Sequence, residues 1–236
     1  MTRLDFLCLA PFLIIASAPI IIMITITISR NYKVIYGFSL FMFLAAFLSL
    51  FIVLPNTPYK VDPLLIFDNY SILLLGTIYC ISFLITILSY VYLNHQGGER
   101  EDYFIILFVA TLGASVLVTA NHFISFFLGL ETLSISLYVL VAYLKNRDYC
   151  IEAGVKFLVI ASVATAFLLF GMGLIYASTG TMSFKDIAVS IGSSGLSPLL
   201  VAGFGMMLVG IGVKLALVPL PMWTPEFYQV APAPLA

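Results

Sequence analysis

Three charged side chains stand inside long apolar runs of this sequence: Glu131, Lys156 and Lys214. Glu131 is the only charged residue in the stretch FFLGLETLSISLYVLV. An ionisable side chain in an apolar membrane segment usually faces the bundle interior or a water-filled cavity, and such residues often form proton relays. The chemistry that these three residues could perform is therefore proton transfer.

Glu131 has hydroxyl neighbours at helical spacing. Residues at i, i+3 and i+7 share one face of a helix, and here they are Glu131, Ser134 and Tyr138. A carboxylate followed by two hydroxyls forms a polar stripe that could hold water. The alternative is structural, because Glu131 could simply be paired with a neighbouring basic side chain.

Lys156 opens another apolar run and has an acidic residue one turn before it. Glu152 lies at the i, i+4 spacing, with the acid first, which favours an ion pair along a helix. Lys156 could also extend its ammonium group to the membrane interface while its alkyl stem stays in the apolar region. Lys156 is therefore either a structural residue, paired with Glu152 or directed to the interface, or a group that takes part in proton transfer.

Lys214 lies deep in the run MMLVGIGVKLALVPLPMW. Gly203 and Gly210 share a face before it, and small residues allow close approach of another helix. Pro219 and Pro221 follow it and cannot donate backbone hydrogen bonds, which predicts a helix that kinks or unwinds after the lysine. A broken helix beside a buried charge is typical of ion sites in transporters. A structural Lys–Glu pair is the alternative.

The composition is that of a membrane protein, so the segments that carry these residues are expected to span a membrane. The chain has 236 residues, of which 62% are hydrophobic and 9% charged, and its mean hydropathy is +1.15. The apolar runs are continuous rather than alternating, which predicts an all-α bundle of transmembrane helices and excludes a barrel. The net charge of −1 gives no basic surface for a nucleic-acid partner. The cysteines are too scattered for a metal site.

The apolar runs predict a single transmembrane domain over 1–236 with about seven spans. A helix needs about 20 apolar residues to cross the hydrocarbon core. A seventh span should begin near Leu196 and break near Lys214–Pro219. A short interfacial helix is expected within 179–195, and a proline-marked turn at 55–69. The six complete spans are predicted at 6–28, 34–54, 70–93, 103–120, 123–144 and 151–178, with the first three in 1–93.

The basic residues predict the orientation. Lys and Arg favour the cytoplasmic side of short loops. The N-terminal tail and the even-numbered loops hold Arg3, Lys60 and Lys185. The odd-numbered loops hold Arg30, Lys33, Arg100, Lys145 and Arg147. Three basic residues against five place the N-terminus outside.

Three blocks of the sequence resemble one known family when taken in order. They are GLETLSISLYVLVAYLKNR, EAGVKFLVIASVATAFLLFGMGLIYASTGT and GIGVKLALVPLPMWTPEFYQVAPAP. Together they resemble the antiporter-like membrane subunits of respiratory complex I, and most closely the subunit N group of bacterial NADH-quinone oxidoreductase. The resemblance covers most of 100–236.

The resemblance implies a proton-translocating subunit of the membrane arm, in the bacterial inner (plasma) membrane with a periplasmic N-terminus. It matches the family's membrane glutamate to Glu131, the lysine on the broken helix to Lys214 and the lysine of the preceding span to Lys156. It implies no cofactor in this chain; NADH, FMN, iron–sulfur clusters and quinone belong to the rest of the complex. Other membrane-arm subunits and the lipid bilayer are the implied partners, and 103–236 is the start of the first inverted unit.

Three departures from the family keep alternatives open. Pro221 replaces a histidine, Val230 replaces a glycine, and the sequence stops at Ala236, so it corresponds to about the N-terminal half of such a subunit. The alternatives are an Mrp-type cation/proton antiporter subunit, a membrane hydrogenase subunit, or a truncated scaffold that does not pump.

Overall fold

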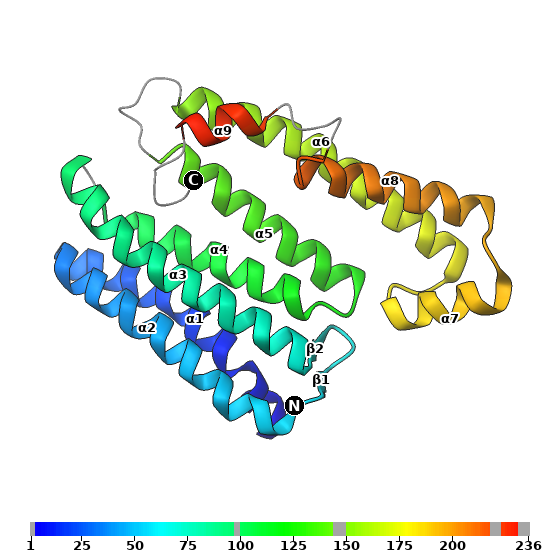
Figure 1. Ribbon diagram of the computed structural model, residues 1–236, viewed down its shortest axis with the longest axis horizontal. Helices are drawn as coiled ribbons and strands as arrows, with labels where there is room; N and C mark the ends of the chain where they lie inside the picture. Colours follow the sequence, from blue (N-terminus) through cyan, green and yellow to red (C-terminus); the bar gives the residue numbers. More distant parts are fainter. Residues whose placement is uncertain (1–2, 97–99, 144–149, 218–222, 231–236) are drawn as a thin grey trace.

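Long helices lying side by side make up most of this protein (Figure 1). The structure is a computed structural model that describes residues 3–96, 100–143, 150–217 and 223–230. Six helices in these ranges are long and apolar enough to cross a membrane. They are α1 (Arg3–Ile28), α2 (Tyr32–Val53), α3 (Asn69–Gln96), α4 (Asp102–Thr119), α5 (Phe123–Val141) and α6 (Cys150–Thr179). A shorter apolar helix, α8 (Pro198–Lys214), follows. The predicted all-α membrane bundle is confirmed.

Polar residues at the predicted loop positions start several of these helices. The Asn31 side chain accepts a hydrogen bond from the Lys33 backbone N–H before α2. The Ser197 hydroxyl accepts one from Leu200 N–H before α8, and Pro198 occupies the first turn, where its missing N–H costs nothing. The span limits therefore lie within a few residues of those predicted.

The segment 55–69 contains a structure that the sequence did not predict. A short 3₁₀ turn, η1 (Leu54–Asn56), is followed by a hairpin of β1 (Tyr59–Val61) and β2 (Leu65–Phe67). The two strands are antiparallel, with Lys60 opposite Ile66. Strands of three residues are too short to show a clear alternation, so the sequence indicated only a turn.

This hairpin joins the loops at one end of the bundle. The Tyr59 hydroxyl bonds Asp5 Oδ1 near the start of α1, at 2.7 Å. Leu65 forms an isolated β-bridge with Ala120, between α4 and α5. A second bridge joins His122 to Ser183, at the start of α7 (Phe184–Ser194). The predicted short helix within 179–195 therefore exists, and it lies at the same end as the N-terminus and the hairpin (Figure 1).

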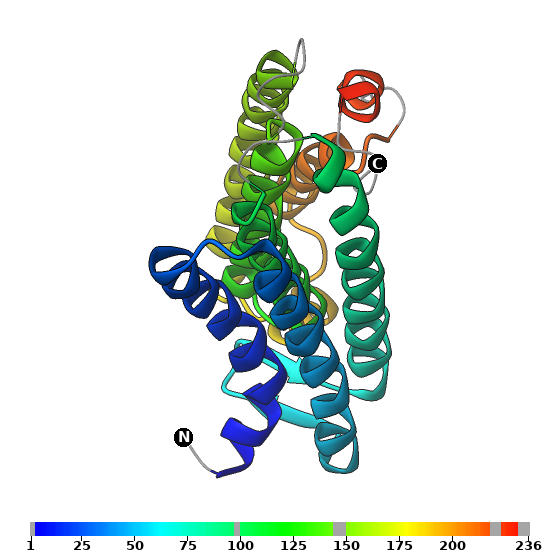
Figure 2. The same ribbon diagram turned by 90° about the vertical axis from the view of Figure 1, so that its left-hand side faces the viewer.

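The helices form two neighbouring groups, one of α1 to α4 and the other containing α6 and α8, with α5 packed against α4 and α6. Figure 2 shows α1 to α3 nearest the viewer, with α6 and α8 farther away. The first group packs around buried aromatic rings, among them Phe43 of α2 and Phe108 of α4, stacked with centroids 4.1 Å apart. Hydroxyl pairs such as Ser82–Thr111, at 3.0 Å, join α3 to α4. Interhelical hydrogen bonds of this kind stabilise bundles whose surroundings are apolar.

Candidate functional site

Glu131 of α5 and Lys214 of α8 form an ion pair inside the bundle. Lys214 Nζ lies 2.6 Å from Glu131 Oε1, although the residues are 83 positions apart. The Lys214 side chain is only 9% exposed and the Glu131 side chain 20%. Glu131 lies eight residues after Phe123, which is about 12 Å into a hydrocarbon core about 30 Å thick. The structure thus brings together two of the three predicted site residues inside the helix bundle.

Two hydroxyl groups add polar contacts to this pair. Thr165 of α6 donates to the same oxygen of Glu131, at 2.7 Å. Lys214 Nζ also donates to the hydroxyl of Ser134, at 3.0 Å. A lysine ammonium group carries three donors, so two of them are directed at α5. Three helices therefore supply the site, with Glu131 and Ser134 on the same face of α5, as the helical spacing predicted.

Close packing of α8 on α6 allows Lys214 to reach across. A Cβ atom added at Gly210 would lie 2.7 Å from the Ala164 carbonyl oxygen, and one at Gly203 would lie 3.0 Å from that of Gly171. These distances leave no room for a side chain. Ala164 directly precedes Thr165, so the contact at Gly210 lies beside the hydroxyl that binds Glu131. The predicted small-residue face of α8 is confirmed.

Helix α8 ends directly at Lys214. The Leu217 N–H bonds the Gly212 carbonyl at 2.8 Å, and the Ala216 N–H bonds the Val213 carbonyl at 3.2 Å. This pair of bonds is the Schellman motif that closes many helices. Ala216 occupies its left-handed position with φ of 52°. That position usually holds glycine, because a Cβ atom is crowded there.

The break therefore begins before the prolines that predicted it. Pro219 and Pro221 lie outside the described residues. The residue before a proline is disfavoured in the helical conformation, so α8 must stop ahead of Pro219. The turn at Ala216 stops it earlier, so that Lys214 is the last helical residue. The charged side chain thus lies at the helix end, beside carbonyl groups that no further helical turn satisfies.

Trp223 contacts this helix end from beyond the break. Its indole Nε1–H donates to the Val213 carbonyl at 2.9 Å. Its ring stacks on Phe157 of α6, with centroids 4.4 Å apart and planes inclined by 18°. The Phe157 ring in turn packs edge-on against Tyr138 of α5, at 4.7 Å. Tyr138 is the third member of the predicted stripe and is buried. The short helix α9 (Thr224–Val230) follows beside the first turns of α6 (Figure 1).

Lys156 lies apart from the Glu131–Lys214 pair. It forms the predicted i, i+4 ion pair with Glu152, at 3.0 Å, and both side chains are about half exposed. Lys156 and Thr165 lie nine residues apart on α6, which corresponds to about 13 Å along the axis. Lys156 also lines a cavity of about 290 Å³, here called the Lys156 cavity. The other lining residues are Ala153, Val155, Phe157, Val159, Ile160 and Trp223.

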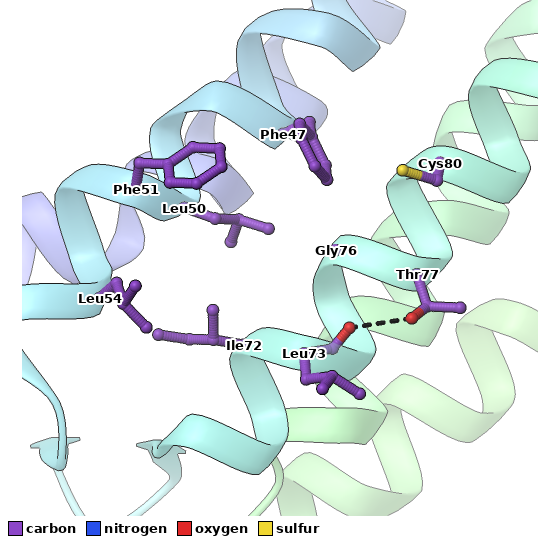
Figure 3. Close-up of a pocket in the computed structure, with 9 residues that line it drawn as sticks. All are labelled: Phe47, Leu50, Phe51, Leu54, Ile72, Leu73, Gly76, Thr77 and Cys80. Carbon is purple, nitrogen blue, oxygen red and sulfur yellow. Dashed lines mark hydrogen bonds between the residues drawn. The ribbon is translucent and has the colours of Figure 1, made fainter.

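A larger cavity, of about 450 Å³, lies between α2 and α3 and has a different chemistry (Figure 3). Its only polar side-chain groups are the Thr77 hydroxyl, which bonds the Leu73 carbonyl of its own helix, and the Cys80 thiol. The apolar lining comes from Phe47, Leu50, Phe51, Leu54, Ile72, Leu73 and Gly76. It offers no group for charge transfer. Over the ranges that the structure describes, no cluster of His, Cys, Asp and Glu could hold a metal ion.

Two residues of the site were not predicted from the sequence. Thr165 is one of many hydroxyl residues in apolar runs, and nothing in its spacing distinguishes it. Trp223 lies in the stretch WTPEFY, which contributed to a resemblance but indicated no contact. Their roles depend on the packing of separate helices, which a single sequence does not show.

The part of the chain that holds this site is similar to known membrane proteins. Residues 120–236 match the family model described as NADH:quinone oxidoreductase/Mrp antiporter, TM. A chain of respiratory complex I from Thermus thermophilus, solved with bound aureothin, is similar over 95% of this chain and 48% of its own length, with 25% identity and a TM-score of 0.75. An archaeal membrane-bound sulfane sulfur reductase shares the fold, with a TM-score of 0.85 at 22% identity over 99% of this chain and 49% of its own. The chain thus spans about half the length of both.

Proposed function

We propose that this chain, whose residues 120–236 match the family model described as NADH:quinone oxidoreductase/Mrp antiporter, TM, translocates protons as a membrane-arm subunit of an NADH-quinone oxidoreductase. One observation carries the proposal. A buried lysine at the end of a broken helix contacts a buried glutamate, with 2.6 Å between Nζ and Oε1. Intramembrane pairs of this kind lie on ion and proton pathways.

The geometry suggests how the pair would move a proton. While the Glu131 carboxylate lies beside Lys214, it stabilises the ammonium form of that lysine. A charge arriving from a neighbouring subunit would draw Glu131 away or neutralise it, and the ammonium group would then release its proton. Ser134 gives Lys214 a second oxygen at 3.0 Å, so the lysine stays oriented during the exchange. NADH oxidation and quinone reduction would occur elsewhere in the complex, because this proposal assigns no redox group to the chain.

Lys156 is the proposed third residue of the pathway. It lies about 13 Å from Thr165 along α6, at the end of the helix where the Lys156 cavity opens beside Trp223. A proton released by Lys214 would need such a group to continue along the membrane arm. The Lys156–Glu152 pair is half exposed, which suits a group that exchanges protons with water or with a partner subunit.

A cation/proton antiporter subunit is a second candidate. The family description that matches residues 120–236 includes Mrp antiporters, and the ion pair would serve exchange as well as pumping. The two proposals differ in their driving force. Proton movement that follows NADH addition supports the first, whereas proton movement that follows a sodium gradient without NADH supports the second.

We also propose that the protein lies in the inner (plasma) membrane of a bacterium with its N-terminus in the periplasm. The end that carries the N-terminus, the hairpin and α7 holds Arg3, Lys60 and Lys185, whereas the odd-numbered loops of the sequence hold five basic residues. This distribution follows the preference of basic residues for the cytoplasmic side. Thiol labelling of a cysteine placed at Lys60 or at Lys33 from outside intact cells tests it.

Proton uptake by inverted membrane vesicles tests the function. Lys214→Met and Glu131→Gln should each abolish uptake driven by NADH, while Lys185→Gln, a charge removal on the exposed surface of α7, should leave it unchanged. Immunoblots of the same vesicles check that each variant is present. Normal uptake with Lys214→Met would rule out the proposed role, and a chain that acts only as a scaffold would give that result.

A further inference from the structure

Trp223, which lies beyond the break, contacts the end of α8 directly and the Glu131 face of α5 through one intervening ring. It bonds the carbonyl of Val213, the residue directly before Lys214, at 2.9 Å. Through its ring it contacts Phe157, which contacts Tyr138 on the Glu131 face of α5. Trp223 therefore touches the helix end that carries the lysine and the side-chain stack that leads to the carboxylate.

The Trp223 hydrogen bond is made to a backbone carbonyl in the last turn of α8. The Val213 carbonyl is among the last carbonyls of the helix, which have no partner in a following turn. It accepts a hydrogen bond of 3.2 Å from the N–H of Ala216, the residue in the left-handed conformation. The shorter bond from Trp223 adds a second donor, and this donor comes from a different element. The position of the helix end, and with it the Lys214 side chain, thus depends on where Trp223 lies.

Trp223 contacts a sequence neighbour of each lysine, Val213 before Lys214 and Phe157 after Lys156. Glu131 contacts Thr165 on α6, and seven residues farther along α5 Tyr138 contacts Phe157. Phe157 directly follows Lys156, so this aromatic contact lies at the level of the Lys156 cavity. Trp223 and Phe157 both line that cavity. The Trp223 and Phe157 rings are therefore part of the wall of the Lys156 cavity.

We infer that Trp223 is a positioning residue for Lys214: its indole N–H holds the broken end of α8 so that the ammonium group reaches Glu131, and its ring is held in place by the stack on Phe157 in the wall of the Lys156 cavity. Displacement of Trp223 would release both contacts at once. The transport part of this inference rests on the proposed function. The coupling between Trp223 and the ion pair does not.

Intrinsic fluorescence tests the coupling without any transport assay. The chain contains one tryptophan, so emission excited at a wavelength that tyrosine barely absorbs reports on Trp223. The full chain would be reconstituted in phosphatidylcholine vesicles, and its emission maximum and its quenching by acrylamide recorded. Coupling between two sites is reciprocal, so Lys214→Met and Glu131→Gln should shift the emission to the red and increase quenching, whereas Lys185→Gln should not. Identical emission in all four proteins would overturn the inference.

Transport variants test the positioning role. Trp223→Phe keeps a ring to stack on Phe157 but has no N–H, and one lost hydrogen bond should lower NADH-driven proton uptake about fivefold at equal amounts in the membrane. Phe157→Leu, which keeps the Trp223 N–H but removes the stack, should also lower it. Normal uptake with Trp223→Phe, when Lys214→Met abolishes uptake, overturns the positioning role and leaves the proposed function intact. If Lys214→Met also has no effect, the proposed function fails, and the fluorescence result alone decides the coupling.

Discussion

Thr165 donates its hydroxyl hydrogen to the same carboxylate oxygen of Glu131 that accepts from Lys214, at 2.7 Å. The Ala161 carbonyl of its own helix, at 2.9 Å, is a second acceptor for the same single hydrogen, so the two oxygens share it in a three-centre bond. Because α6 thereby fixes the carboxylate, the position of Glu131 depends on a residue outside the ion pair. A proton-transfer site needs this kind of support, since small displacements of the reacting groups are costly.

Thr165→Val should impair both the position of Glu131 and the stability of the protein. Valine has a similar shape but no donor, and a hydrogen bond to a charged group contributes about 1.5–3 kcal/mol. We expect proton uptake to fall about tenfold and the thermal midpoint to fall by several degrees. Uptake by inverted vesicles and thermal unfolding in detergent measure the two effects.

Two variants control for this change. Thr165→Ser keeps the hydroxyl and should restore most of the uptake. Ser162→Ala removes an exposed hydroxyl on the same helix whose recorded bond is to the Leu158 carbonyl, and should have little effect. If Ser162→Ala and Thr165→Val behave alike, the hydrogen bond to Glu131 has no special role.

Gly210→Ala should move Lys214 away from Glu131. The added methyl group would lie 2.7 Å from the Ala164 carbonyl oxygen, so α8 would have to shift away from α6. Overpacking of this kind typically costs about 1–3 kcal/mol. We expect a lower thermal midpoint together with reduced proton uptake.

The control for Gly210 lies on the other face of the same helix. A Cβ atom added at Gly205 meets nothing within 4 Å. Gly205→Ala should therefore leave uptake unchanged and raise helix stability by about 0.5–1 kcal/mol. Equal losses from both substitutions would show that the glycine content of α8, rather than the contact with Ala164, matters.

The positions of the helices and of the charged residues could be predicted from the sequence. Apolar runs of sufficient length determine the spans, and charges within such runs stand out because their burial is costly. The stripe of Glu131, Ser134 and Tyr138 follows from helical spacing alone. The partner of Glu131 could not be derived in this way, because Lys214 lies 83 residues away and only tertiary packing brings the two together.

Local structure that depends on distant partners was also not predictable. The hairpin at Tyr59–Phe67 forms because Leu65 pairs with Ala120 and Tyr59 bonds Asp5, in addition to its own short ladder. The predicted break after Lys214 is confirmed, but the left-handed turn at Ala216 that ends α8 was not predicted. Glycine is the usual sign of such a turn, and an alanine gives no warning.

Ala216→Gly should stabilise the protein. The left-handed conformation costs an L-residue roughly 1–2 kcal/mol, and glycine adopts it freely. The greater freedom of glycine in the unfolded chain offsets part of this gain, so we expect the thermal midpoint to rise by about 1–3 °C. Uptake should be retained, because the Schellman bonds are kept.

The control for Ala216 is Ala202→Gly, an exposed position inside α8. Glycine there should destabilise the helix by about 0.5–1 kcal/mol, which is the opposite sign. A drop in the midpoint with Ala216→Gly as large as that with Ala202→Gly would contradict the assigned turn. Ala216→Val, by contrast, should be more destabilising than Ala202→Gly, because a branched side chain is poorly tolerated at positive φ.

Lys156→Gln separates a role in transport from a role in folding. Its ion pair with Glu152 is half exposed, and pairs of this kind contribute about 0–1 kcal/mol. The thermal midpoint should therefore change by no more than a few degrees. If Lys156 continues the pathway from Lys214, uptake should nevertheless fall strongly. Glu152→Gln removes the same ion pair and serves as the matched control, with uptake largely kept. Equal uptake in the two variants would mean that Lys156 acts only through its pair with Glu152.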